Sequence, residues 1–203
     1  MIAKTYFSGF DGAIETYNAI SEASDGRIYY VLCSTKHDVA AQLYVYDPKT
    51  DATEFLADLS EAVGEKHLNY ISQGKSHTEF YEVDQKLYFA THVGFYEMID
   101  GAQNMPVTPP EGYKLYPGGH FVYYDMKTKE VKSMAKDPNA EGILAMTMDV
   151  DRKQMYAITW PTGHLLHYDV EKDVLKDLGP VSGPGEAGKR GDDYRVLCRS
   201  LLV

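Results

Sequence analysis

Apolar and polar positions recur along the chain in short segments of strand length that are separated by polar turns. In three of these segments an apolar stretch ends in Tyr-Asp and runs into a charged turn. The three copies are residues 42–51, 120–129 and 164–173. The short alternating stretches that follow them are residues 53–58, 130–134 and 174–178. Each copy therefore predicts a strand, a tight turn and a returning strand.

A second repeated pattern precedes each of these hairpins. It begins with a polar turn and continues into a strand rich in tyrosine and aliphatic residues, at residues 25–31, 84–90 and 151–158. One more candidate strand lies before each turn, at residues 17–23, 77–83 and 144–150. One unit is therefore four strands joined by two tight turns and one longer loop.

Antiparallel four-stranded units with a repeat length of roughly 40 to 50 residues are typical of a β-propeller. A single blade cannot bury both of its faces, and its neighbours in the ring cover them. We predict an all-β chain with blades at about residues 16–60, 76–135 and 143–179, and a fourth begun at residues 195–203. A β-sandwich and a solenoid are the alternatives, but a sandwich does not need the same Tyr-Asp turn three times.

Three blades and one strand fall short of a closed ring, because propellers have roughly four to eight blades. We expect the chain to be the N-terminal part of a longer propeller of about six to eight blades. Assembly of two chains into one ring is the alternative.

The repeats resemble the broad superfamily of YVTN, quinoprotein and WD40-like β-propellers over nearly the whole chain. Residues 43–50 and 122–128, with their turns, carry the resemblance. The Gly-His and Trp-Asp pairs of true WD40 repeats are missing, and Trp160 precedes Pro161 instead. The resemblance implies the fold. At the level of fold alone, the chain also distantly resembles propeller-type polysaccharide lyases such as oligogalacturonate and ulvan lyases. Those enzymes use His, Tyr and Arg, sometimes with a divalent metal.

Composition narrows the classes of function. The chain has 30 acidic and 20 basic residues, a net charge of -10, which argues against binding a nucleic-acid backbone. No apolar run approaches the roughly 20 residues of a membrane span, and the N-terminus lacks the apolar core of a signal peptide. We therefore expect a cytoplasmic location by default, or a periplasmic or secreted one if the natural N-terminus lies upstream. Cys33 and Cys198 indicate part-buried thiols rather than a disulfide framework.

The long loops all fall on one face of the predicted propeller. In each blade, the loop before the first strand and the loop between the second and third strands open on that face. The loops concerned are residues 34–41, 69–77, 91–119, 160–163 and 181–194. Residues 93–119 carry several aromatic side chains, which favours an ordered flap. Loops held by a rigid scaffold often carry function, so we expect the ligand site on this face.

Histidine and arginine are the candidate reactive residues of this face. His77 begins the first strand of its blade, His92 ends the next strand, and Arg199 falls in a later first strand. Arginine can bind a carboxylate at two points, and histidine can act as a general base or ligate a divalent metal. We expect the catalytic candidates to be His77, His92 and Arg199. The ligand-binding candidates are Lys75, Tyr96, His120, Trp160, His164 and Arg195.

These residues support two functions. The first is a non-catalytic propeller that binds a small molecule, a saccharide or a protein. The second is a carbohydrate-active enzyme such as a uronate-polysaccharide lyase, in which a His or Tyr removes a proton and Arg or a metal neutralises the carboxylate. His120 and His164 occupy equivalent repeat positions, which also favours a structural role for both. A quinoprotein-like redox enzyme is disfavoured by the single tryptophan.

Overall fold

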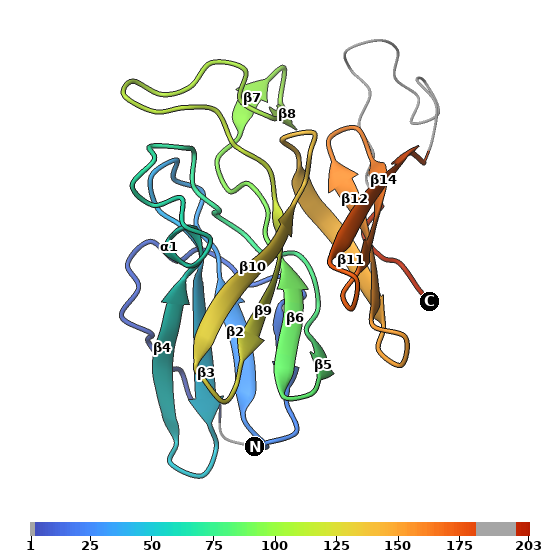
Figure 1. Cartoon of the computed structure of the whole chain (residues 1–203). Coiled ribbons are helices and arrows are strands. Elements are labelled where there is room, and N and C mark those ends of the chain that lie inside the picture. The colour runs from blue at the N-terminus through green and yellow to red at the C-terminus, as the bar shows by residue number, and fades with distance from the viewer. Residues whose placement is uncertain (1–2, 182–197) are drawn as a thin grey trace.

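The structure is a computed structural model that describes residues 3–181 and 198–203. Its strands form three four-stranded antiparallel sheets and one small hairpin (Figure 1). The first sheet has the order β1 (Ile20–Glu22), β2 (Ile28–Leu32), β3 (Gln42–Asp47) and β4 (Ala52–Asp58). A single helical turn, α1 (Leu59–Ala62), follows at once.

The second and third sheets repeat this meander. The second contains β5 (Tyr81–Val83), β6 (Lys86–Ala90), β9 (His120–Asp125) and β10 (Glu130–Lys136). The third contains β11 (Gly142–Asp149), β12 (Gln154–Trp160), β13 (His164–Asp169) and β14 (Val174–Pro180). The hairpin β7 (Glu97–Ile99) and β8 (Ala102–Asn104) is inserted between β6 and β9. The predicted all-β fold of four-stranded blades is confirmed.

The repeated aspartate of the Tyr-Asp pattern closes the turn of each outer hairpin. The side chains of Asp47, Asp125 and Asp169 accept hydrogen bonds from backbone N–H groups two or three residues further on, at 2.8, 2.9 and 3.0 Å. An aspartate that bonds its own turn in this way stabilises the reversal of the chain. The repeat in the sequence is therefore a structural signal.

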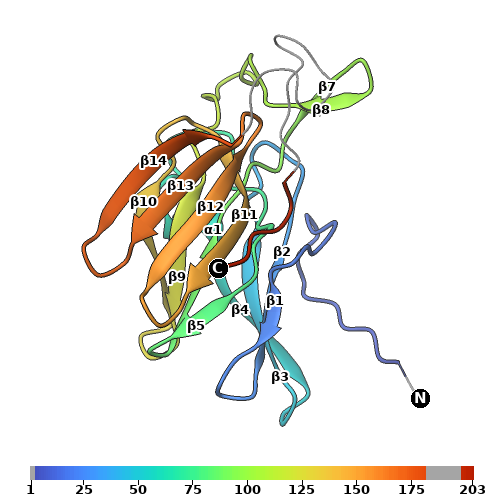
Figure 2. The ribbon, with the colours of Figure 1, turned by 90° about the vertical axis from the view of Figure 1, so that its right-hand side faces the viewer.

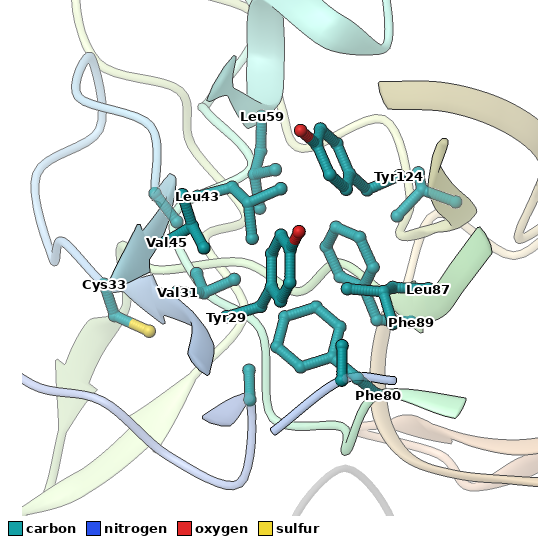
Figure 3. Close-up of a cluster of buried hydrophobic side chains, with 14 residues drawn as sticks. Tyr29, Val31, Cys33, Leu43, Val45, Leu59, Phe80, Leu87, Phe89 and Tyr124 are labelled. Atoms are coloured by element: carbon teal, nitrogen blue, oxygen red, sulfur yellow. The ribbon is translucent and has the colours of Figure 1, made fainter. Parts of the chain in front are cut away.

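Successive sheets pack face to face through two apolar clusters. The first lies between the first and second sheets and includes Tyr29, Leu43 and Phe89 (Figure 3). The second lies between the second and third sheets and includes Phe121 and Met155. The middle sheet is thus buried on both faces, which explains why β6 is apolar on both sides. Each fully buried side chain of this size contributes about 1.5–3 kcal/mol.

The expected strand at residues 195–203 is not observed where the structure describes this segment. Residues 198–203 form no strand, and residues 195–197 lie outside the described residues. The C-terminal segment lies instead beside β11 (Figure 2). Ser200, Leu201 and Leu202 line a hollow there together with Ala145 and Met146. A β-strand needs a paired neighbour, and the described residues pair no strand with this segment. The number of blades in a closed ring stays a prediction.

Candidate functional site

A cleft of about 300 Å³ opens where the ends of the three sheets meet the β7–β8 hairpin. Every sheet contributes to its wall, either from a strand or from a segment that leads into or out of one. The lining residues are Tyr17, Lys75, His77, His92, Tyr96, Ala102, Gln103, Leu144, Trp160 and Arg199. The cleft therefore depends on all three blades being in place.

Backbone pairing beyond the ends of the sheets positions the two histidines. Lys75 and His92 form an isolated antiparallel bridge, with N–H to carbonyl distances of 2.9 and 2.8 Å. The hydroxyl of Ser76 also donates to the carbonyl of Ala90 at 2.8 Å. These bonds hold the segment before β5 against the end of β6. As a result the rings of His77 and His92 lie nearly perpendicular, with centroids 4.7 Å apart.

Glycines allow the segments around the cleft to approach closely. A Cβ atom on Gly74 would lie 2.7 Å from the Cα atom of Gly94 and 2.8 Å from the carbonyl oxygen of Ser34. A Cβ atom on Gly142 would overlap the imidazole of His92. Side chains at these positions would force the segments apart, so the absence of a Cβ atom determines the shape of the site.

Lys75 is a buried cation at the base of the cleft, with only 2% of its surface exposed. Its Nζ donates to Oε1 of Glu15 at 2.8 Å and to the hydroxyl of Tyr17 at 2.9 Å. The rings of Tyr17 and Tyr96 each lie 4.9 Å from this ammonium group, which is cation–π distance. Burial acts to raise the pKa of Glu15, but the hydrogen bonds from Lys75 and Tyr17 lower it, so the carboxylate stays charged.

His77 and His92 are neutral side chains with unsatisfied nitrogens. His77 is 8% exposed, and its Nε2 has no hydrogen-bond partner among the described residues. Burial, together with the charges of Lys75 and Arg199, lowers the pKa of His77 to about 3. Burial also lowers the pKa of His92 far below its usual range, and Nδ1 of this ring lies buried against the backbone of Gly142. Both rings are therefore uncharged, and the unpartnered Nε2 belongs to His77.

Aromatic side chains also line the cleft. The ring of Trp160 lies 5.4 Å from that of Tyr96, edge to face, and 5.9 Å from that of His92. Trp160 belongs to a third apolar cluster that also includes Leu144. Burial raises the pKa of Tyr96, so its phenol stays protonated. The cleft thus combines cationic side chains with aromatic rings.

Six of the residues that the sequence singles out line this one cleft. They are Lys75, His77, His92, Tyr96, Trp160 and Arg199. The structure brings them together from four separate segments of the chain. Their roles in binding or catalysis remain predictions. Arg195 lies outside the described residues.

His120 and His164 do not line this cleft, which argues against the ligand-binding role expected for them there. Nε2 of His120 lies 3.0 Å from Oε1 of the buried Glu65. Nδ1 of His164 lies 2.8 Å from Oδ2 of Asp177. In both cases the backbone N–H donates to the hydroxyl of a buried threonine that ends the preceding strand segment, at 2.8 and 2.9 Å. Equivalent contacts in two blades indicate a structural role.

Sequence reasoning missed Glu15, Tyr17 and Gln103. Tyr17 and Gln103 line the cleft, and Glu15 is the counterion of Lys75. A buried lysine requires a carboxylate partner, but the sequence placed Lys75 in a loop and did not predict its burial. The position of that partner in the sequence could not be predicted from spacing.

The described part of the chain contains no group of three or more His, Cys, Asp or Glu side chains that could hold a metal ion. Lys75 and Arg199 also act electrostatically on His77, and a divalent cation would be repelled by both. Neither observation favours the divalent metal considered from the sequence. In the same described residues, no helix is long and apolar enough to cross a membrane.

Comparisons with known proteins add little beyond the fold. No protein-family model matches the sequence, and no curated protein matches it either. Among solved structures, the chain is similar to TolB from Acinetobacter baumannii, with a TM-score of 0.46 and 12% identity over 86% of this chain and 34% of that one. It is similar to a mutant of the GH43 protein BlXynB from Bacillus licheniformis, with a TM-score of 0.46 and 10% identity over 86% and 33%. The chain spans about a third of the length of these two structures.

Proposed function

We propose that the cleft binds a small organic anion that carries one ring. The observation that supports this most strongly is the buried Nε2 of His77, which has no partner among the described residues and belongs to a side chain that lines the cleft. An unsatisfied buried nitrogen costs about 1–3 kcal/mol. A ligand oxygen in the cleft would remove that cost.

The charges around the cleft favour an anion. Glu15 neutralises Lys75 through a direct ion pair of 2.8 Å. No carboxylate among the described residues lies within ion-pair distance of Arg199, whose guanidinium can hold a carboxylate at two points. Counting only the residues that the structure describes, the cleft therefore carries one positive charge without a counterion, on a chain whose net charge is -10.

The size and lining of the cleft restrict the rest of the ligand. A volume of about 300 Å³ is at the small end of ligand pockets. Trp160 and Tyr96 are aromatic residues of the lining, which favours a ligand with a ring that can pack against them. A sugar acid of one residue combines a carboxylate for the cation with a ring for the aromatic side chains.

Calorimetric titration of the wild-type protein with galacturonate, and with galactose as its neutral counterpart, tests the proposal. We expect galacturonate to bind at least about tenfold more tightly than galactose, because a charge-assisted pair contributes about 1.5–3 kcal/mol. Arg199→Gln should lose that preference. Arg152→Gln, the same change at an exposed arginine paired with Asp149, should keep it. Equal binding of both sugars, or an unaffected Arg199→Gln variant, would contradict the proposal.

The lyase alternative makes a different prediction for the same cleft. An efficient general base has a pKa near the working pH, whereas that of His77 is about 3 in the ligand-free protein. Burial and the Glu15 contact raise the pKa of Tyr17, so its phenol is protonated too. We therefore expect oligogalacturonate to be left intact. Appearance of the ultraviolet absorbance of an unsaturated uronate product would favour the lyase, and no response to any small anion would favour a protein partner.

A further inference from the structure

We propose that an organic acid enters this cleft together with one proton, which Nε2 of His77 takes from solvent and holds against the ligand. The inference rests on the proposed function, because it needs an anion in the cleft. It adds that binding is linked to pH and that His77 is the residue responsible. No covalent bond changes: the anion and the proton bind together and leave together.

The surroundings of His77 explain why its ring is neutral without a ligand. Glu15 and Tyr17 face it from the segment before β1, and the Tyr17 ring centroid lies 4.0 Å from that of His77. Lys75 stands two residues earlier on its own segment, Arg199 faces it from the C-terminal segment, and His92 packs against it after β6. Glu79, also on its own segment, lines a neighbouring hollow with it.

These neighbours place two cations and one close carboxylate around a buried imidazole. Burial is the largest influence on the pKa of His77, Lys75 and Arg199 lower it further, and Glu15 opposes them only partly. The phenol of Tyr17 is already committed as a donor to Glu15, at 2.5 Å. The Nε2 atom of His77 is therefore left buried without a partner among the described residues, in a side chain that lines the cleft.

A bound carboxylate reverses this balance. An anion about 4 Å from the ring, at an effective dielectric constant of about 20, favours the protonated imidazole by about a thousandfold. The protonated ring then donates its Nε2–H to the anion, and the anion offsets the repulsion from the two cations. Because the bound state holds a proton that the free state lacks, affinity rises as the pH falls, by at most about tenfold per pH unit.

Calorimetry with galacturonate at pH 7 and pH 5, in two buffers that differ in ionisation enthalpy, tests the inference. The carboxylate of this probe stays ionised over that range. We expect binding at pH 5 to be about tenfold tighter than at pH 7, with uptake of close to one proton at pH 5. His77→Gln should lose the pH dependence and the proton uptake, whatever its affinity at pH 7. His67→Gln, the same change at an exposed histidine, should keep it.

The outcomes separate this inference from the proposed function. Binding of equal strength at both pH values, with no proton uptake, would overturn the inference and leave the anion site standing, because a neutral ring would then be the donor. A pH dependence that survives in His77→Gln would also overturn it. No binding at either pH would overturn both proposals.

A measurement on the wild-type protein guards against a variant that does not fold. The ring carbon signals of labelled histidine report protonation directly. At pH 5, addition of galacturonate should move the His77 signals to the protonated position and leave those of His67 unchanged. Unmoved His77 signals at saturating galacturonate would overturn the inference.

Discussion

Replacing Gly142 with alanine adds one methyl group at the most crowded point of the cleft. The new Cβ atom would overlap Nδ1 of His92 and lie 2.5 Å from Cε1 and 2.8 Å from Cγ of the same ring. The φ angle of Gly142 is not among the positive values of the chain, so the backbone itself accepts alanine. Any destabilisation by Gly142→Ala must therefore come from contact with the imidazole.

The imidazole has little room to move. His92 is 1% exposed and is enclosed by His77, Tyr96 and Trp160, whose ring centroids lie 4.7, 6.3 and 5.9 Å from its own. Overpacking of this kind costs about 1–3 kcal/mol. Removal of a glycine, taken alone, stabilises a compatible site by about 0.4–1 kcal/mol through the unfolded chain. We expect a net loss of about 1–2 kcal/mol in the free energy of unfolding.

Urea unfolding followed by the fluorescence of the single tryptophan, Trp160, measures this loss close to where it arises. The decisive comparison is a double-mutant cycle. In a His92→Ala background the ring is gone, so Gly142→Ala should be neutral or stabilising, and the coupling energy should be about 1–3 kcal/mol. An equal effect of Gly142→Ala in both backgrounds would refute the steric argument.

Two further predictions concern stability. The pKa of His77 is lowered from 6.5 to about 3 in the folded protein, so the contribution of this neutral side chain to stability is present above pH 6.5 and is lost as the pH falls toward 3. Relative to His77→Gln, the free energy of unfolding of the wild type in urea should fall by about 2 kcal/mol between pH 7 and pH 5. The same pH dependence of stability in both proteins would contradict the burial argument. Gln73 accepts from Thr91 and Tyr116 at 2.7 and 2.6 Å and donates to Glu65 at 2.8 Å. Gln73→Leu leaves these buried groups unpaired and should cost about 3 kcal/mol, so a loss below about 1 kcal/mol in the same assay would show that the network relaxes.

The three sheets could be predicted because their signals are local. Each Asp of the Tyr-Asp pattern bonds its own turn within three residues, and each strand shows its apolar positions directly in the sequence. The strand expected at residues 195–203 had no such turn to support it. Residues 198–203, the part that the structure describes, lie beside β11 without pairing as a strand.

Much of the cleft could be predicted because the repeat indicates which loops share a face. His77, His92 and Trp160 were placed by their position at the ends of strands, and the structure brings them together. Glu15 could not be placed in this way, because it pairs with Lys75 across 60 residues of chain and no periodicity records that contact. The sequence also could not show where the side chain of His120 points, because its partner Glu65 comes from the loop of another blade.

The cleft takes one wall from each sheet, with Tyr17 leading into the first, His92 following β6 and Trp160 ending β12. Neither one blade nor any pair of blades contains the whole lining of the cleft. Local opening of one sheet would therefore abolish the site as completely as global unfolding would. A ligand in the cleft should therefore slow amide hydrogen exchange in all three blades, and not only in the strands that it touches. The three blades would then open as one cooperative unit.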